Sequence, residues 1–172
     1  MSAYFSIDMP DGIYGGVELF YAQSDDAWAI EGYFKRIAIG DMPSSEPTKI
    51  YFDPKSGNLN GQIGYEDLAI YHKKIEEVFN THLNSINYIK GRELIDYMKA
   101  VVSCGEELTK SQLNEIIDRC NDAKNIPMNC DLFSDSTEYN TEFWEFVECM
   151  YDVISQILKY HKEDYYLIHF CY

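Results

Sequence analysis

The chain has 172 residues, of which 29 are acidic and 14 are basic, so its formal net charge is −15. A surface this negative is repelled by nucleic-acid phosphates and by anionic membranes and attracts basic partners, so we expect no direct binding to nucleic acid or membranes. Hydrophobic residues make up 46% of the chain, which is enough for one folded domain with a sizeable core.

The N-terminal part, up to about residue 65, alternates polar and apolar positions between turn residues, which is typical of β-strands. We predict strands over Tyr4–Asp8, 17–22, 27–39, Lys49–Phe52 and Leu59–Gly64. Glycine and aspartate predict turns at 11–16 and 53–58, and Ser24-Asp25-Asp26 is expected to form a hairpin loop. Two prolines in 42–47 indicate a further loop.

The remainder shows helical spacing of apolar residues and then a final strand pattern. We predict helices over 66–86, 91–103, 109–123 and Thr141–Tyr160. The third of these opens with a capping box, in which Thr109 and Gln112 bond each other's backbone N–H groups. Residues 165–172 are too apolar to stay exposed, so we expect them to pair with the N-terminal sheet as a strand.

These elements predict one α+β domain that spans residues 1–172. Its parts are an N-terminal antiparallel β-meander of four to five strands, about four helices, and a C-terminal strand that returns to the sheet. The five cysteines are an odd number, and no secretory leader or membrane-spanning run is evident. A cytoplasmic protein with reduced thiols is therefore expected.

No catalytic signature, metal motif or phosphate-binding loop is present in the sequence. His72 and His82 are ten residues apart on one predicted helix, about 15 Å by helical rise, so they cannot share a metal ion. Counted as an EF-hand loop, residues 131–142 fail at Phe133 and Ser136, where a ligand and a glycine are required. We therefore expect no enzyme activity, no metal and no cofactor.

The most informative feature is a run of acidic residues near the C-terminus. Between Asn125 and Leu158 the chain has seven carboxylates and neither lysine nor arginine. On a helical wheel the apolar side chains of 141–160 share one face, and four acids lie on an arc of roughly 120° opposite them. These four residues, which we call the acidic stripe, are Glu142, Glu145, Glu148 and Asp152. Like charges at this spacing repel each other on a helix, so the stripe indicates a use beyond solubility.

The stripe favours an acidic protein that binds and inhibits a basic protein, for example an immunity-type protein that neutralises a nuclease-like toxin or another nucleic-acid-handling enzyme. Nuclease surfaces are positive because they hold phosphates, and carboxylates about 5–6 Å apart can occupy such a surface. Long-range attraction would accelerate the association. The expected partner-binding residues are the stripe together with Asp135, Glu138 and the aromatic anchors Tyr139 and Trp144.

Three alternatives remain open at this point. The first is a phage-type DNA mimic that blocks a defence enzyme, which would use the same stripe. The second is a small enzyme or small-molecule-binding domain with a pocket between sheet and helices, lined by Trp28, Tyr33 and Phe34. The third is a structural adaptor whose charge serves solubility only. For Trp144, which lies at the edge of the apolar face, a place at the rim of the core is the alternative to a partner contact. The sequence does not predict the oligomeric state.

Overall fold

The computed structural model describes residues 2–10, 17–83, 96, 99–100, 103, 105, 107, 109–114, 132–134 and 141–172. In these residues five strands form one antiparallel sheet: β1 (Tyr4–Asp8), β2 (Glu18–Gln23), β3 (Lys49–Phe52), β4 (Leu59–Gly64) and β5 (Tyr165–Cys171). Three long helices accompany them: α1 (Ser24–Ala38), α2 (Tyr65–Leu83) and α5 (Thr141–Tyr160). The predicted α+β fold is confirmed.

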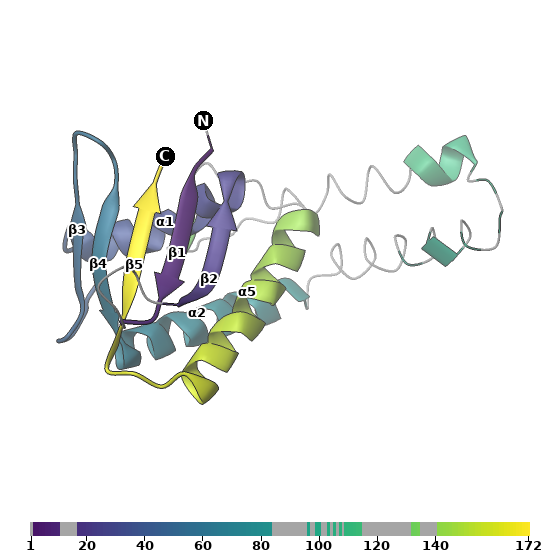
Figure 1. Cartoon of the computed structure of the whole chain (residues 1–172). Helices are drawn as coiled ribbons and strands as arrows, with labels where there is room; N and C mark the ends of the chain where they lie inside the picture. Colours follow the sequence, from purple (N-terminus) through teal and green to yellow (C-terminus); the bar gives the residue numbers. More distant parts are fainter. Residues whose placement is uncertain are drawn as a thin grey trace.

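The strand order is β2-β1-β5-β4-β3, so the last strand lies in the middle of the sheet (Figure 1). β5 pairs antiparallel with β1 on one side, with Phe5 opposite Phe170, and with β4 on the other, with Leu59 opposite Phe170. The predicted return of the C-terminal strand is therefore confirmed. Its effect is to join two hairpins, β1–β2 and β3–β4, into one sheet.

One face of the sheet packs on the helices. Because successive side chains of a strand point to opposite faces, every second residue lies on this buried face. In β5 the side chains of Tyr166, Ile168 and Phe170 are buried, whereas the residues between them are partly exposed. In Figure 1 α1 passes behind the strands, α2 runs past their lower ends, and α5 stands beside β2. The core therefore lies between one sheet face and the three helices.

The prediction of a hairpin loop at Ser24-Asp25-Asp26 and a strand over 27–39 is wrong, because α1 occupies this segment. Ala27, Ile30, Phe34 and Ile37 are buried, and their spacing of three, four and three residues is helical. Asp25 and Asp26 lie in the first turn and Lys35 and Arg36 in the last, which matches the helix dipole.

Gly32 lies within α1 because another backbone segment packs closely against the helix at this position. A Cβ at this position would lie 3.3 Å from Cα of Ser134, whose backbone N–H donates to the carbonyl of Ala29 at 2.9 Å. The segment that contains the buried Leu132 and Phe133 thus lies directly against α1. Close approach of two backbones is a common reason for glycine within a helix.

The other predicted helices are tested only in part. The prediction of 66–86 agrees with α2 as far as Leu83, and Thr141–Tyr160 agrees with α5 at both ends. The capping box is confirmed: Thr109 N donates to Gln112 Oε1 at 2.9 Å, and Gln112 N donates to Thr109 Oγ1 at 3.2 Å. Most of 91–103, 115–123 and the predicted turn at 11–16 lie outside the described residues.

Candidate functional site: the acidic face of α5

α5 is held firmly by its apolar face, as its sequence pattern predicts. Val147, Met150 and Ile154 are fully buried. The ring of Phe146 lies 6.3 Å from that of Phe20 in β2, and the Tyr71 hydroxyl of α2 lies 3.8 Å from Met150 Sδ. Because the helix packs on both the sheet and α2, side chains on its outer face have fixed backbone positions.

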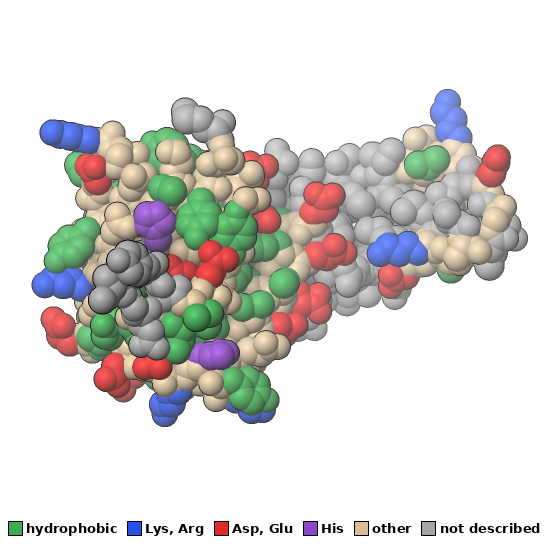
Figure 2. All heavy atoms as spheres, viewed as in Figure 1, with side chains coloured by type: hydrophobic (Ala, Val, Ile, Leu, Met, Phe, Trp, Pro, Cys, Tyr) green, Lys and Arg blue, Asp and Glu red, His purple; other side chains and the backbone are tan. Residues whose placement is uncertain are grey.

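All four residues of the acidic stripe are exposed, on the side of α5 opposite the core. In Figure 2, which has the same view as Figure 1, red Asp and Glu side chains follow α5 in a column, without a blue Lys or Arg side chain among them. Among the described residues, no Lys or Arg side chain forms an ion pair with Glu142, Glu148 or Asp152. Lys73 and Lys74 of α2 therefore do not neutralise these three carboxylates.

The negative surface continues onto the two neighbouring helices. At one end, Asp26 of α1 has a pKa raised above its ordinary value by burial, then by repulsion from Asp25 and from Glu142. At the other end, Glu76 of α2 lies close enough to Tyr151 of α5 to raise the pKa of its hydroxyl, although burial raises it more. The acidic face thus spans three helices.

Of the other predicted contact residues, the structure places only Trp144. Trp144 has no exposed surface, and its ring meets that of Phe143 at 5.4 Å. Its expected role as an anchor for a partner is therefore wrong for this structure, since the indole lies in the core. Asp135, Glu138 and Tyr139 lie outside the described residues. Sequence position alone placed Trp144 at the edge of the apolar arc, and the packing of α5 decides its burial.

His72 of α2 lies beneath the edge of this acidic face. Its ring stacks on that of Tyr151, with centroids 4.4 Å apart and planes inclined by 15°. The Nε2 atom is buried without a hydrogen-bond partner. Burial lowers the pKa of His72 below its ordinary value, and the negative charge of Glu76 opposes this effect. A protonated ring at this position would carry an N–H without an acceptor, which is costly.

We expect His72 to make the fold less stable in mild acid. Its pKa is lower in the folded than in the unfolded chain, so the unfolded chain binds the proton first as the pH falls through about 6.5. The contribution of His72 to the free energy of unfolding should therefore decrease from pH 7 to pH 5. In His72→Phe, which keeps a stacked ring but does not titrate, thermal unfolding should show a smaller decrease over this range. An equal pH dependence of both proteins would contradict the assignment.

The exposed thiol of Cys149 provides a direct probe of the acidic face, since it lies on α5 between Glu148 and Asp152. At low salt we expect a cationic methanethiosulfonate reagent to modify Cys149 about tenfold faster than an anionic one, after normalisation to glutathione. High salt should remove most of this preference. Mass spectrometry of the Cys149 peptide measures both rates. Equal rates at low salt would mean that the potential at α5 is not negative.

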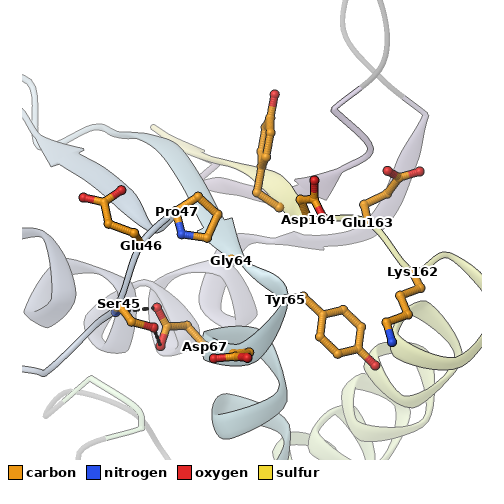
Figure 3. A pocket seen from close by; sticks show the side chains of 11 residues that line it. Ser45, Glu46, Pro47, Gly64, Tyr65, Asp67, Lys162, Glu163 and Asp164 are labelled. Atoms are coloured by element: carbon orange, nitrogen blue, oxygen red, sulfur yellow. Dashed lines mark hydrogen bonds between the residues drawn. The ribbon is translucent and has the colours of Figure 1, made fainter.

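A pocket of about 830 Å³ lies elsewhere, between the start of α2 and the segment before β5 (Figure 3). Its lining residues are Ser45, Glu46, Pro47, Gly64, Tyr65, Glu66, Asp67, Lys162, Glu163, Asp164 and Tyr165. The prediction that Trp28, Tyr33 and Phe34 line a pocket between sheet and helices does not hold for this one. Tyr33 and Phe34 are buried core residues, and Trp28 packs on Phe170 and Tyr172.

Several polar groups at this pocket hold neighbouring segments together. The buried carboxylate of Asp67 accepts hydrogen bonds from Ser45 N at 3.0 Å and from the Thr48 hydroxyl, and so fastens the loop before β3 to α2. Lys162 lies over the Tyr65 ring at 5.0 Å, and the Tyr65 hydroxyl donates to the Leu158 carbonyl at 3.0 Å. These contacts explain the pocket as a junction between loops, and they assign it no chemistry.

Within the described part of the chain, no three His, Cys, Asp or Glu side chains are arranged to hold a metal ion. The helices described there are also too short or too polar to cross a membrane. Comparisons of the chain with protein-family models, with curated proteins and with solved structures found no match.

Proposed function

We propose that this protein is an acidic inhibitor of the immunity type, which neutralises a basic nuclease-like toxin or another nucleic-acid-handling enzyme. The observation that carries the proposal is the acidic stripe: four exposed carboxylates on a helix whose opposite face is anchored in the core. The backbone that carries these carboxylates is already ordered before a partner binds. Binding therefore costs less conformational entropy than it would if the same carboxylates were on a mobile loop.

The physical basis is competition for a positive surface. A nuclease holds phosphates with lysine and arginine, and the net charge of −15 draws such a protein toward the acidic face. Asp25, Asp26 and Glu76 extend the negative surface beyond α5 onto α1 and α2. A positive surface wider than one helix could therefore contact it. The proposal assigns the protein to the cytoplasm, in keeping with the free thiols of Cys149 and Cys171.

A DNA mimic directed against a defence enzyme uses the same contacts and is the closest alternative. Carboxylates at helical spacing lie about 5–6 Å apart at Cβ, which is comparable with the spacing of phosphates along a strand. The identity of the bound protein separates these two functions, because one is a toxin and the other a host enzyme. Within the part of the chain that the structure describes, no contact favours the second alternative, a small enzyme or small-molecule-binding domain.

The test is a pull-down from a lysate of the source organism, with the tagged full chain as bait and with washes at low and at high salt. We expect one stoichiometric basic protein that high salt releases, since exposed charge pairs are screened. Staining for nucleic acid controls for indirect capture. A bound protein that is neutral or acidic, or that resists high salt, would refute the charge-based mechanism. A second pull-down, from the same organism after expression of a toxin from a plasmid, detects partners that are not made constitutively.

A further inference from the structure

The face of the sheet that points away from the helices carries a second group of interacting side chains. Tyr4, Ser6 and Asp8 alternate onto this face of β1, and the antiparallel register places Tyr21 opposite Ser6 and Glu18 opposite Asp8. On the other side of β1, His169 of β5 is opposite Ser6. We call Tyr4, Asp8, Glu18 and Tyr21 the hairpin site.

The hairpin site contains a pair of like charges in direct cross-strand register. Asp8 and Glu18 face each other across β1 and β2, an arrangement that is ordinarily destabilising. Burial raises the pKa of Asp8, repulsion from Glu18 adds to this, and the hydrogen bond from Ser6 at 3.2 Å and the nearby His169 oppose it. Sheets normally place a cation or a neutral residue opposite a carboxylate, so this pair needs an explanation.

Among the described residues, no lysine or arginine neutralises the pair. The first basic residue of the chain is Lys35, so neither hairpin strand nor the segment between them supplies one. β4 and β5 also lack lysine and arginine. Lys49 of β3 is in the same row as Asp8 but three strands away, about 14 Å. The two carboxylates therefore form a local negative site that is separate from α5.

Two tyrosine rings lie against each other on this face, and one of them, Tyr4, contacts Glu18. The rings of Tyr4 and Tyr21 have centroids 4.9 Å apart and planes inclined by 58°, so they form an open angle rather than a stack. The Tyr4 hydroxyl donates to Glu18 Oε2 at 2.9 Å, which fixes the carboxylate beside the ring. Tyr21 is 39% exposed, so part of its side chain is accessible from solvent. Aromatic faces attract cations within about 6 Å.

We propose that the hairpin site binds a guanidinium group, presented by an arginine of a peptide or protein partner. A planar guanidinium can stack on a tyrosine ring while its N–H groups donate to two carboxylates, which a compact ammonium group does less well. Binding would relieve the repulsion between Asp8 and Glu18. Anionic ligands are disfavoured by the same charges, and a metal ion lacks a third protein ligand among the described residues.

This inference does not depend on the proposed inhibitor function. In Figure 2 red side chains over the lower part of β1 and β2 and those over α5 are visible from the same side, with green and tan surface between them. The site uses residues of the sheet alone, and a small peptide suffices to test it. The titratable groups at the site are Tyr4, Asp8, Glu18, Tyr21 and the neighbouring His169. All titrations are therefore made at one fixed pH near 7.5.

The test is an NMR titration of the ¹⁵N-labelled full chain with acetyl-Gly-Arg-Gly-amide. Parallel titrations use the peptide with lysine and the peptide with citrulline, the neutral isostere of arginine. We expect chemical-shift changes confined to β1, β2 and the facing part of β5, with a dissociation constant in the millimolar range. The lysine peptide should bind about threefold more weakly and the citrulline peptide at least about tenfold more weakly.

Variants separate this site from α5 and from effects on folding. Asp8→Asn/Glu18→Gln keeps the shapes and should weaken arginine binding at least about tenfold. Tyr21→Ala should weaken it several-fold, whereas Tyr21→Phe should not. Glu145→Lys/Glu148→Lys on α5 should leave it within about twofold. Equal binding of arginine and citrulline, shift changes centred on α5, no binding at about 50 mM peptide, or unchanged affinity of the double variant would each overturn the proposal.

Discussion

Removal of residues 165–172 should leave a chain without a cooperative unfolding transition. These residues form β5, which pairs with β1 on one side and with β4 on the other, so their loss separates the sheet into two hairpins. The side chains of Tyr166, Ile168 and Phe170 leave the core with it. Each such side chain contributes about 1.5–3 kcal/mol by burial, against a total stability of about 5–15 kcal/mol. Circular dichroism during heating measures the transition.

A pair of single substitutions shows whether the effect comes from the core face of β5. Phe170→Ala removes a fully buried ring and should lower the free energy of unfolding by about 3–5 kcal/mol. His169→Ala, on the open face and bonded to Asn60 at 2.6 Å, should cost about 1 kcal/mol or less. A truncated chain that remains soluble and unfolds cooperatively would show that β5 is not required for the fold.

Reversal of two charges in the middle of the acidic stripe should abolish most of the binding to a basic partner. In Glu145→Lys/Glu148→Lys, attraction becomes repulsion at two neighbouring positions, and like charges in an interface cost several kcal/mol. We expect the dissociation constant at low salt to rise by about 10²–10³-fold, chiefly through slower association. Both side chains are exposed, so the melting temperature should change by only about 2 °C.

The matched control changes the net charge equally at another place. Glu46→Lys/Glu163→Lys, beside the pocket of Figure 3, also takes the formal charge from −15 to −11, because each substitution adds two units. It should weaken binding only slightly, since it leaves α5 unchanged. Isothermal titration calorimetry and stopped-flow measurements with the captured partner give both quantities. Equal losses in the two variants would mean that net charge, and not the stripe, determines binding.

Much of the fold follows from local sequence pattern. Strands β1, β3 and β4 and both ends of α5 were predictable because each has an uninterrupted period, two for the strands and 3.6 for the helix. α1 was not, because Trp28, Ile30, Gly32 and Phe34 also alternate. The competing signal was present in Ala27, Ile30, Phe34 and Ile37, together with the acids at one end and the bases at the other.

The candidate sites differ in how visible they are in the sequence. The stripe lies on one helix, so its geometry follows from spacing alone. Trp144 could not be assigned to surface or core until the packing of α5 was known. The hairpin site depends on pairing that no local pattern specifies, including a bulge between Ile7 and Asp8 that brings Glu18 opposite Asp8. His169 and Asp8 are neighbours only because β5 enters beside β1.

The central place of β5 has a consequence during synthesis on the ribosome. β4 ends at Gly64 and β5 begins at Tyr165, so one hundred residues are translated between them. At about 5–20 residues per second this takes about 5–20 s. During this time β1 can pair only with β2 and β4 only with β3, so one backbone edge of each has no partner strand. Such edges recruit other chains. The nascent chain is therefore most prone to aggregation, and most dependent on chaperones, until β5 has emerged and pairs with β1 and β4.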